Sequence, residues 1–305
     1  MKVLVTGGAG FIGSHVVDKL LLAGHTPIVV DNLSNGVASN LPPHIPLYAW
    51  DLLSPKLEQL FQQEQPEIVI HLAAQANVSH SLEDPLQDAA ANIFGTLHLL
   101  HCCKLYHVKK FIFSSTSAVY GDASLPITEQ SPVDPLSFYG LSKLTAERYI
   151  AFFGQLHNLP YTILRYANVF GPRQKANGEG GVISIFIHEL LSGRTPFIRG
   201  DGQQTRDFVY VEDVAKANVL CITSGDYETF NIGYDQQTSI RTLYELIATK
   251  LHSATLPAQH PPIPGEIMHS RLTSTKAIQQ LNWQPSFTLD TGLEATIAHM
   301  KHHYS

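Results

Sequence analysis

The chain has 305 residues and a formal net charge of −6, and 44% of its residues are hydrophobic while 15% are charged. This composition is typical of a globular protein and excludes wholesale disorder, and the excess of acidic residues disfavours a surface built for nucleic acid or for a membrane. The three cysteines are too few for a disulfide framework, so we expect a reduced, cytoplasmic protein. We expect neither a secretory signal nor a membrane-spanning segment.

Short runs of β-branched residues alternate with helical stretches in the first half of the chain. Strands are predicted at residues 3–5, 28–30, 47–50, 67–70, 110–113 and 161–165, and helices at 11–23, from Ser54 (N-cap) and Pro55 onward, at 86–106 and at 141–157. Apolar strands that alternate with helices form a parallel sheet with both faces covered. The sequence therefore predicts an α/β fold, a doubly wound parallel (Rossmann) sheet with a smaller C-terminal α/β substrate-binding region.

Beyond about residue 171, glycine and proline become frequent and the predicted elements shorten. We assign residues 1–170 to the sheet domain, rejoined by about residues 207–235, because strands predicted at 209–211 and 229–232 can return to the sheet. Residues 171–206 and 236–305 are assigned to the smaller region, whose loops would close over a ligand.

A glycine-rich motif, Thr-Gly-Gly-Ala-Gly-Phe-Ile-Gly at residues 6–13, lies between the first predicted strand and the first helix. Its glycines permit a tight turn and allow the backbone to approach a pyrophosphate, whose charge meets the helix N-terminus. Asp31 ends the second strand, where a carboxylate accepts hydrogen bonds from an adenosine ribose and repels a 2′-phosphate. The combination indicates a site for NAD rather than NADP, although a glycine-rich turn can also serve helix–strand packing alone.

A tyrosine and a lysine four residues apart, Tyr139 and Lys143, share one face of a predicted helix. A phenol has a pKa of about 10, so it acts as a base near neutrality only if its phenolate is stabilised by about 4 kcal/mol. The ammonium of Lys143, together with the positive nicotinamide ring of bound NAD, is a source of that stabilisation. Ordinary amphipathic helices also carry this pair, but here it follows a strand that ends in the hydroxyl residues 114–117, at the sheet edge where ligands bind.

Further motifs stand at residues 31–36, 71–74, 116–121, 165–172 and 200–208. With these and the two motifs above, nearly the whole chain resembles the extended short-chain dehydrogenase/reductases, and among them the nucleotide-diphosphate-sugar 4-epimerases of the UDP-glucose (UDP-galactose) 4-epimerase type. The resemblance implies an isomerase with NAD as its cofactor and a nucleotide sugar as its substrate.

The resemblance also implies the catalytic and cofactor-binding residues. Tyr139 would be the base, Lys143 would tune it and hold the nicotinamide ribose, and Thr116 would bind the sugar O4 and relay its proton to Tyr139. Tyr166 would lie beside the nicotinamide. The full set implied to contact NAD is Gly7, Gly10, Phe11, Ile12, Gly13, Asp31, Asn32, Asn35, Gly36, Asp51, Leu52, Leu72, Ala73, Ala74, Asn92, Ser114, Tyr139, Lys143 and Tyr166.

For the substrate, the resemblance implies contacts along the second half of the chain. Phe197 and Ile198 would border the uracil, and Arg206 would bind the diphosphate, because a guanidinium matches phosphate oxygens. The full set implied to contact the substrate is Thr116, Asn168, Val182, Phe197, Ile198, Arg206, Glu266 and Ser270. No metal site is assigned, because the sixteen histidines lack further ligands at metal-binding spacing.

The two residues after Thr116 bear on the reaction. Related dehydratases carry an Asp-Glu pair there and UDP-glucuronate decarboxylases a Glu, whereas this chain has Ser117 and Ala118. A dehydratase needs an acid and a base near C5 and C6, but an epimerase needs no further acid. The sequence therefore favours 4-epimerisation of a UDP-hexose. A UDP-glucuronate 4-epimerase, an NDP-sugar 4,6-dehydratase and a non-catalytic NAD-sensing protein remain as alternatives.

The choice of sugar and the oligomeric state are less fixed by the sequence. Ile263 stands where relatives usually have an arginine before a Pro-Gly-Asp/Glu turn, which puts one nucleotide contact in doubt. Ser270 falls where a bulky residue narrows the sugar pocket in some relatives, so UDP-GlcNAc and UDP-GalNAc are candidate substrates beside UDP-glucose and UDP-galactose. The resemblance implies a homodimer joined through the helices at 86–106 and 141–157, although their apolar faces fit packing within one monomer equally well.

Overall fold

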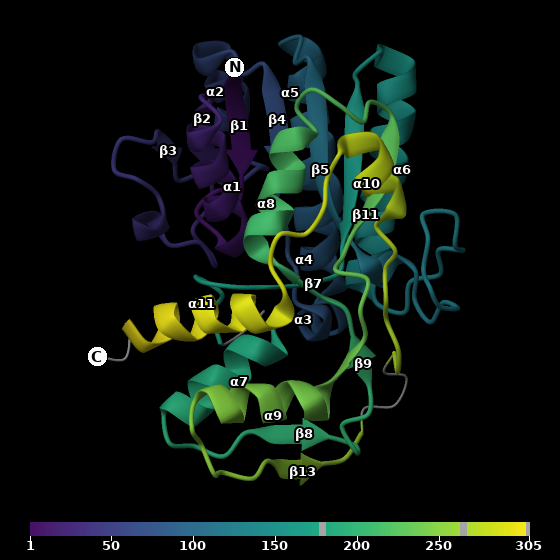
Figure 1. Cartoon of the computed structure of the whole chain (residues 1–305). Helices are drawn as coiled ribbons and strands as arrows, with labels where there is room; N and C mark the ends of the chain where they lie inside the picture. Colours follow the sequence, from purple (N-terminus) through teal and green to yellow (C-terminus); the bar gives the residue numbers. More distant parts are fainter. Residues whose placement is uncertain (177–180, 263–266, 303–305) are drawn as a thin grey trace.

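The computed structural model describes residues 1–176, 181–262 and 267–302. Its centre is a seven-stranded parallel sheet in the order β3-β2-β1-β4-β5-β6-β11 (Figure 1). The strands are β1 (Lys2–Thr6), β2 (Thr26–Val30), β3 (Leu47–Tyr48), β4 (Ile68–His71), β5 (Lys110–Thr116), β6 (Tyr161–Tyr166) and β11 (Glu228–Ile232). Successive strands are added on one side of β1 up to β3 and on its other side from β4 onward. Ligands of such sheets bind beyond the carboxyl ends of the strands at this point of reversal. The predicted doubly wound α/β fold is confirmed.

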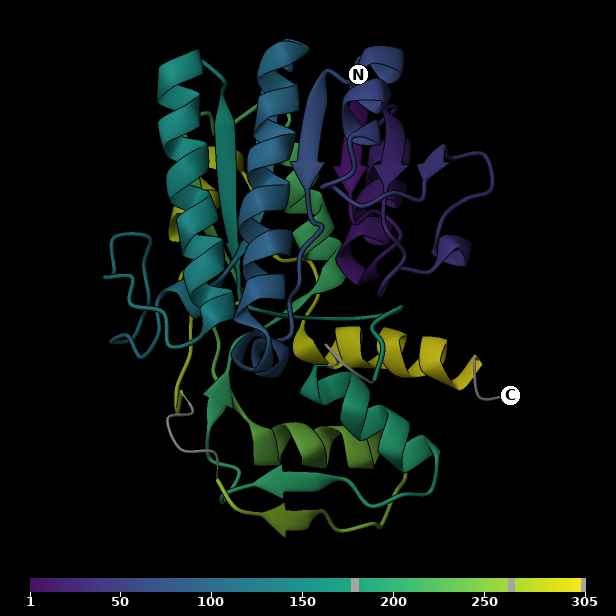
Figure 2. The same ribbon diagram turned by 180° about the vertical axis from the view of Figure 1, so that it is seen from behind.

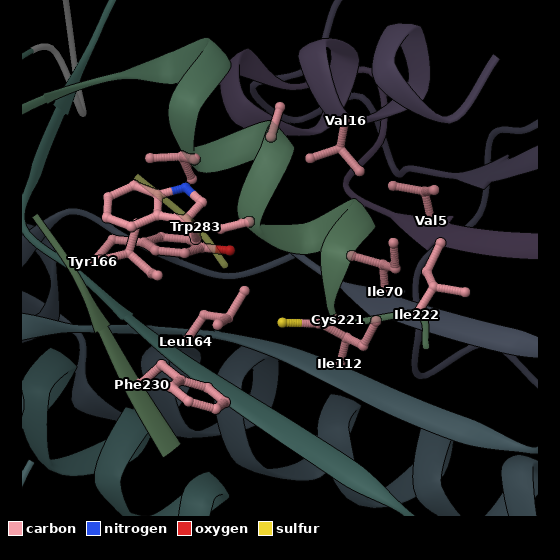
Figure 3. Close-up of a cluster of buried hydrophobic side chains, with 14 of the residues drawn as sticks. Val5, Val16, Ile70, Ile112, Leu164, Tyr166, Cys221, Ile222, Phe230 and Trp283 are labelled. Atoms are coloured by element: carbon pink, nitrogen blue, oxygen red, sulfur yellow. The ribbon is translucent and has the colours of Figure 1, made fainter. Parts of the chain in front are cut away.

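Alternating side chains on each strand build a hydrophobic core on both faces of the sheet. Val3 and Val5 of β1 belong to one cluster, and Leu4 between them belongs to the other. Figure 3 shows the first cluster, in which side chains of neighbouring strands lie with Trp283 beneath α8. That face is covered by α1 (Phe11–Leu22), α8 (Val211–Leu220) and α10 (Thr275–Leu281), and the opposite face (Figure 2) by α2 (Lys56–Glu64), α5 (Gly95–Leu105) and α6 (Phe138–His157).

A smaller region with its own hydrophobic cluster lies beyond the carboxyl ends of the sheet strands (Figure 1). Its helices are α7 (Val182–Leu191), α9 (Ile240–Lys250) and α11 (Leu289–His302). Its strands form three pairs: β7 (Asn168–Phe170) with β10 (Phe208–Tyr210), β8 (Phe197–Arg199) with β13 (Ala258–His260), and β9 (Thr205–Arg206) with β12 (Thr238–Ser239). The crevice of the sheet therefore faces this region.

One of the two strands expected to return to the sheet does so, and the other does not. The strand predicted at residues 229–232 is confirmed as β11, which pairs with β6. The prediction that the strand at 209–211 joins the central sheet is wrong, because β10 pairs with β7 instead. The chain leaves the sheet directly after β6: Ala167 N donates to Ile232 O, whereas Asn168 N donates to Asp207 O. The proposed domain limits remain a prediction.

The helix predicted at residues 86–106 is interrupted. It begins as α4 (Pro85–Ala89), passes through a π-helical turn, η2 (Ala90–Phe94), and continues as α5. A short helix, α3 (Val78–Glu83), precedes it. A π-helical turn inserts one extra residue into a helix and often marks a functional site.

Other element boundaries differ from the predictions by a few residues. α6 begins three residues before the predicted 141, because Ser137 is its N-cap and accepts a hydrogen bond from Gly140 N. The strand predicted at 47–50 ends at Tyr48, and α2 begins at Lys56, one residue after the predicted Pro55. The short 3₁₀ turns are η1 (Ala38–Asn40) and η3 (Ser117–Val119). Within the described ranges, the chain has no helix both long and apolar enough to cross a membrane.

Candidate active site

The glycine loop between β1 and α1 packs too closely for side chains at its glycine positions. Gly7 has a positive φ of 67°, and a Cβ on it would lie 2.7 Å from the backbone nitrogen of Ala73. A Cβ on Gly13 would lie 2.1 Å from Gly7 O. Because Gly10 precedes the first helical residue, the amides of the first turn of α1 have no acceptor within the helix. This packing and these amides agree with the motif, and the pyrophosphate contact stays a prediction.

Asp31 holds this loop to the segment that follows β2. Its buried carboxylate accepts hydrogen bonds from Ala9 N at 3.0 Å and Leu33 N at 2.8 Å. A Cβ on Gly36 would lie 2.7 Å from Asp31 Oδ1, so the loop closes over the carboxylate only with glycine there. The negatively charged Asp31 carboxylate at the end of β2 can accept hydrogen bonds from ribose hydroxyls and would repel a 2′-phosphate. This supports the predicted preference for NAD.

The predicted residues Asn32, Asn35, Asp51 and Leu52 lie on the loops next to this carboxylate. Asn32 Nδ2 donates to Asp51 Oδ2 at 2.9 Å, and Asp51 Oδ1 accepts from Leu53 N at 2.8 Å. The loops that follow β2 and β3 are therefore joined at one end of the crevice. This is the end where the resemblance assigns the adenosine.

Asn92, on the π-helical turn, joins the segment after β4 to the first turn of α6. Its Nδ2 donates to Gln75 O at 2.9 Å and to Ser142 Oγ at 3.0 Å, and its Oδ1 accepts from Gln75 N at 2.9 Å. Ser142 in turn donates to Tyr139 O at 3.0 Å. The predicted cofactor residues after β4 (Leu72, Ala73 and Ala74) and the predicted catalytic helix are therefore tied together by one buried amide.

Lys143 is buried, with 3% of its surface exposed, and its Nζ lies 4.2 Å from the centroid of the Phe113 ring. Burial lowers the pKa of Lys143 to about 7, against the opposing attraction of Glu147 and Asp88. The ammonium has no hydrogen-bond partner among the described residues. A buried cation of this kind stabilises a nearby anion strongly, since little solvent screens it.

The turn after β5 and the first turn of α6 are in direct contact. A Cβ on Gly140 would lie 2.7 Å from Ala118 O, so a side chain at that position would separate the two turns. Thr116 Oγ1 accepts a hydrogen bond from Ala118 N at 3.1 Å, which leaves the hydroxyl proton of Thr116 to be donated elsewhere. Tyr139 N donates to Ser81 Oγ at 3.1 Å. The structure thus brings the segments that carry Thr116 and Tyr139 together, as expected.

A buried ion pair beneath the site holds α6 to the sheet. Arg165 Nη2 lies 2.6 Å from Glu147 Oε2, and Ser115 Oγ donates to Glu147 Oε1 at 2.5 Å. Arg165 Nη1 donates to the Tyr120 hydroxyl at 2.9 Å. Glu147 was not predicted as a site residue, although it lies one turn beyond Lys143 on the same helix face, which is the available signal.

A cavity of about 230 Å³ opens between Tyr139 and the N-terminus of α7. Two predicted substrate residues, Asn168 and Val182, line it together with Tyr139. Its described lining consists of Ala76, Tyr139, Ala167, Asn168, Val169, Phe170, Gln174, Gly181, Val182, Ile183 and Phe208. The cavity joins the sheet domain to the smaller region, which is where a nucleotide sugar must lie if its sugar is to reach Tyr139.

The side chain of Tyr166 points into the core of the sheet domain, and its predicted place beside the nicotinamide stays a prediction. Its side chain is in the buried cluster on the α8 face of the sheet (Figure 3), and its hydroxyl accepts a hydrogen bond from Asn218 Nδ2 at 2.8 Å. Burial raises the pKa of this phenol, and Ser114 lies beside its hydroxyl. The next residue, Ala167, lines the cavity instead. Successive side chains along a strand point to opposite faces, so Tyr166 and Ala167 are expected to face different sides.

Four other predicted substrate residues lie in the smaller region, outside the described lining of the cavity: Phe197, Ile198, Arg206 and Ser270. The Ile198 side chain is buried in that region's core, while the Phe197 ring stacks on His260 with centroids 4.4 Å apart. Arg206 Nη1 donates to Thr205 O at 2.9 Å, and the backbone of the buried Ser270 donates to the same oxygen at 3.2 Å. Glu266 and Ile263 lie outside the described residues. The uracil and diphosphate contacts therefore stay predictions.

Comparison with known proteins gives consistent matches over the whole chain. The model of the NAD dependent epimerase/dehydratase family matches residues 3–233. A putative UDP-glucose 4-epimerase of Methanocaldococcus jannaschii is 42% identical over 301 residues, which cover 98% of each chain. The structure of a UDP-glucose 4-epimerase of Thermotoga maritima with UDP-glucose is 44% identical, with a TM-score of 0.98 and 100% of both chains covered. A UDP-N-acetylglucosamine 4-epimerase of Methanobrevibacter ruminantium, in complex with UDP-N-acetylmuramic acid, is 36% identical, with a TM-score of 0.94 and coverage of 99% of this chain and 98% of that chain.

Proposed function

The chain belongs to the NAD dependent epimerase/dehydratase family and is a UDP-sugar 4-epimerase, and on this premise we propose that it interconverts UDP-glucose and UDP-galactose. The observation that carries the proposal is the composition of the site. Tyr139 lines a cavity with Asn168, whereas Ser117 and Ala118, the residues after Thr116, carry no carboxylate. The site thus has a base for O4 but lacks, at those two positions, the acid and base that elimination across C5 and C6 requires.

The residues at the crevice fit NAD. The glycine loop packs closely at Gly7 and Gly13, where a Cβ would collide with neighbouring backbone, and Asp31 presents a carboxylate at the end of β2. We assign the pyrophosphate to the first turn of α1, the adenosine ribose to Asp31 and the nicotinamide ribose to Lys143. Bound NAD would supply an acceptor, and afterwards a donor, for the hydride at C4 of the sugar.

Lys143 is assigned to lower the pKa of the Tyr139 phenol. A free phenol has a pKa of about 10, and one unit of pKa corresponds to about 1.4 kcal/mol. Lys143 lies one helical turn beyond Tyr139, and its buried ammonium is poorly screened by water. Burial lowers the pKa of Lys143 to about 7. A phenolate at Tyr139 would raise this pKa again, because a nearby negative charge stabilises the ammonium form of the lysine.

Thr116 is assigned as the relay between the sugar O4 and Tyr139. Its oxygen already accepts Ala118 N–H, so its hydroxyl proton can pass to the Tyr139 phenolate while the oxygen takes the proton of O4. The same proton path would run in reverse, from Tyr139 through Thr116 to O4, when the 4-keto group is reduced on its other face. No further acid or base is needed, because C4 is the one centre that changes.

Acceptance of UDP-GlcNAc and UDP-GalNAc is part of the proposal, supported by the small side chain of Ser270. The test is to incubate the purified protein with UDP-glucose, UDP-GlcNAc and UDP-glucuronate separately, without added cofactor. Proton NMR of the anomeric region then follows each reaction. Growth of the C4 epimer of UDP-glucose is the expected result. A 4-keto-6-deoxy sugar, or epimerisation of UDP-glucuronate alone, would contradict the proposal.

We also propose that the protein is a homodimer joined through α5 and α6. These helices lie side by side on the outer face of the sheet (Figure 2). Phe152 and Leu156 on α6 are 66% and 61% exposed, and Leu105 on α5 is also exposed. Exposed apolar side chains gathered on one surface are typical of a protein interface. A second copy of the same two helices would cover them as a four-helix bundle.

A further inference from the structure

His71, the last residue of β4, lies between two threonine hydroxyls. Its side chain is 1% exposed, with Nδ1 2.7 Å from Thr6 Oγ1 and Nε2 3.0 Å from Thr96 Oγ1. The rings of Phe111 and Phe113 pack against the imidazole. The three polar side chains therefore form a chain that runs from the end of β1 to the start of α5.

The other partners of the two hydroxyls fix the direction of every hydrogen bond in this chain. Thr6 Oγ1 accepts from Leu72 N at 3.2 Å and from Ala73 N at 3.1 Å, so its own proton points to His71 Nδ1. Thr96 Oγ1 donates to the carbonyl of Asn92 at 2.6 Å, so it accepts from His71 Nε2. His71 is therefore a neutral imidazole with its proton on Nε2. Burial, with a smaller contribution from Lys143, holds the pKa of His71 well below its ordinary value of 6.5, in agreement with this assignment.

Both ends of the chain reach segments assigned to bind the cofactor. Thr6 immediately precedes Gly7 of the glycine loop. The carbonyl that receives the Thr96 proton belongs to Asn92 on the π-helical turn, and the Asn92 side chain donates to Ser142, next to Lys143. The chain thus connects the two sides of the crevice through hydrogen bonds of defined direction.

We infer that His71 and Thr96 are positioning residues for NAD binding, which hold the glycine loop and the π-helical turn in register so that Asn92 can fix the Lys143 helix. Neither side chain is assigned a contact with the sugar. The inference rests on NAD binding by the glycine loop and is independent of which UDP-sugar is the substrate. It predicts that loss of the Thr96 hydroxyl weakens NAD binding, because the Asn92 carbonyl and His71 Nε2 both lose their partner.

The fold contains a matched control. Thr296 in α11 is as buried as Thr96 and also donates its hydroxyl to the carbonyl four residues earlier, Gly292 O, at 2.7 Å. It lies in the smaller region, in a helix assigned no cofactor contact. Thr296→Val therefore removes the same kind of hydrogen bond without touching the chain of His71.

The test compares Thr96→Val, Thr96→Ser and Thr296→Val in NAD retained through gel filtration and in the dissociation constant for NAD added back. Thr96→Val is expected to raise that constant about tenfold or more, because two buried hydrogen bonds are lost, and Thr96→Ser to restore it within about twofold. Thr296→Val is expected to leave it within about twofold while lowering the unfolding temperature. Wild-type NAD affinity in Thr96→Val, an equal loss in Thr96→Ser, or an equal loss in Thr296→Val would each overturn the inference.

A measurement on the unaltered holoenzyme covers the case in which Thr96→Val does not fold. Nitrogen-15 NMR of the imidazole ring of His71 reports which nitrogen carries the proton. The expected spectrum is that of a neutral ring protonated on Nε2, unchanged between about pH 5.5 and 8. A ring protonated on Nδ1, or one that titrates in this window, contradicts the inference whatever the sugar substrate proves to be.

Discussion

The ammonium of Lys143 lies over the ring of Phe113, with Nζ 4.2 Å from the ring centroid, and the side chain is almost completely buried. The face of an aromatic ring attracts a cation, but far less strongly than water does. The site therefore holds a charge at a cost to the stability of the folded protein, as sites that must stabilise a reactive anion often do.

Replacing this lysine is expected to separate stability from activity. The pKa of Lys143 falls from 10.5 to about 7 on folding, so between these two values the unfolded chain binds the additional proton. Stability of the NAD-free protein should thus rise as the pH rises through this window, and near pH 7 Lys143→Met should be more stable than wild type by up to a few kcal/mol. Thermal unfolding of the NAD-free proteins at several pH values measures this difference.

The control for Lys143→Met is Lys104→Met, since Lys104 is an exposed lysine near the end of α5. It should change the unfolding temperature little at any pH. Turnover should be lost in Lys143→Met alone. A Lys143→Met protein less stable than wild type across the whole window would contradict the buried-ammonium argument.

Tyr139→Phe should fold normally and lose turnover by a factor of about 10² to 10⁴, the usual contribution of a positioned base. The Tyr139 side chain is half-buried at the cavity, and the substitution removes its hydroxyl while it keeps the aromatic ring that packs there. Tyr149→Phe on the same helix, where the side chain is exposed, is the matched control and should retain full rate. The anomeric NMR assay measures both variants, and a rate near wild type in Tyr139→Phe would refute the assigned role.

Thr116 offers a test of the relay by two substitutions of different chemistry. Thr116→Val keeps the shape of the side chain but removes the hydroxyl, and turnover should fall by about 10² or more. Thr116→Ser keeps the hydroxyl that accepts Ala118 N–H and should retain most of the rate. If the two variants were equally impaired, the role of Thr116 would be one of packing.

Breaking the buried ion pair of Glu147 and Arg165 by neutralising one partner should strongly destabilise the folded protein. Glu147→Gln leaves the Arg165 charge buried without its partner, and we expect a loss of about 3–5 kcal/mol in the free energy of unfolding by denaturant. Glu67→Gln, which breaks the exposed pair with Lys109, is the control and should cost less than about 1 kcal/mol. Similar losses in the two variants would show that burial does not set the cost of breaking the pair.

The exposed apolar surface of α5 and α6 gives a test of the proposed dimer. Placing like charges at Phe152 and Leu156 (Phe152→Glu with Leu156→Glu) should yield a folded monomer, because neither charge would have a partner if it were buried there. Leu256→Glu, at an 82% exposed leucine outside these helices, should not change the mass in solution. Light scattering after gel filtration measures the masses, and an unchanged mass of the double variant would place the interface elsewhere.

Features that depend on neighbours along the chain could be predicted from the order of residues. A glycine loop between a strand and a helix, an aspartate at the end of the next strand, and a tyrosine and lysine one helical turn apart all follow from the fixed periods of strands and helices. Those motifs, and the alternation of strands and helices, were sufficient for the doubly wound fold and for the cofactor it binds.

Tertiary structure alone decided which segments pair and which side chains are buried. β10 pairs with β7 rather than with the sheet, because the chain turns away from β11 between Ala167 and Asn168. The same turn leaves Ala167 at the cavity and the Tyr166 side chain in the core. The neutral state of His71 likewise depends on hydroxyls that β1 and α5 bring to it from distant parts of the sequence. Pairing and protonation are set by contacts between remote residues and by the exclusion of water, and neither is encoded in a local pattern.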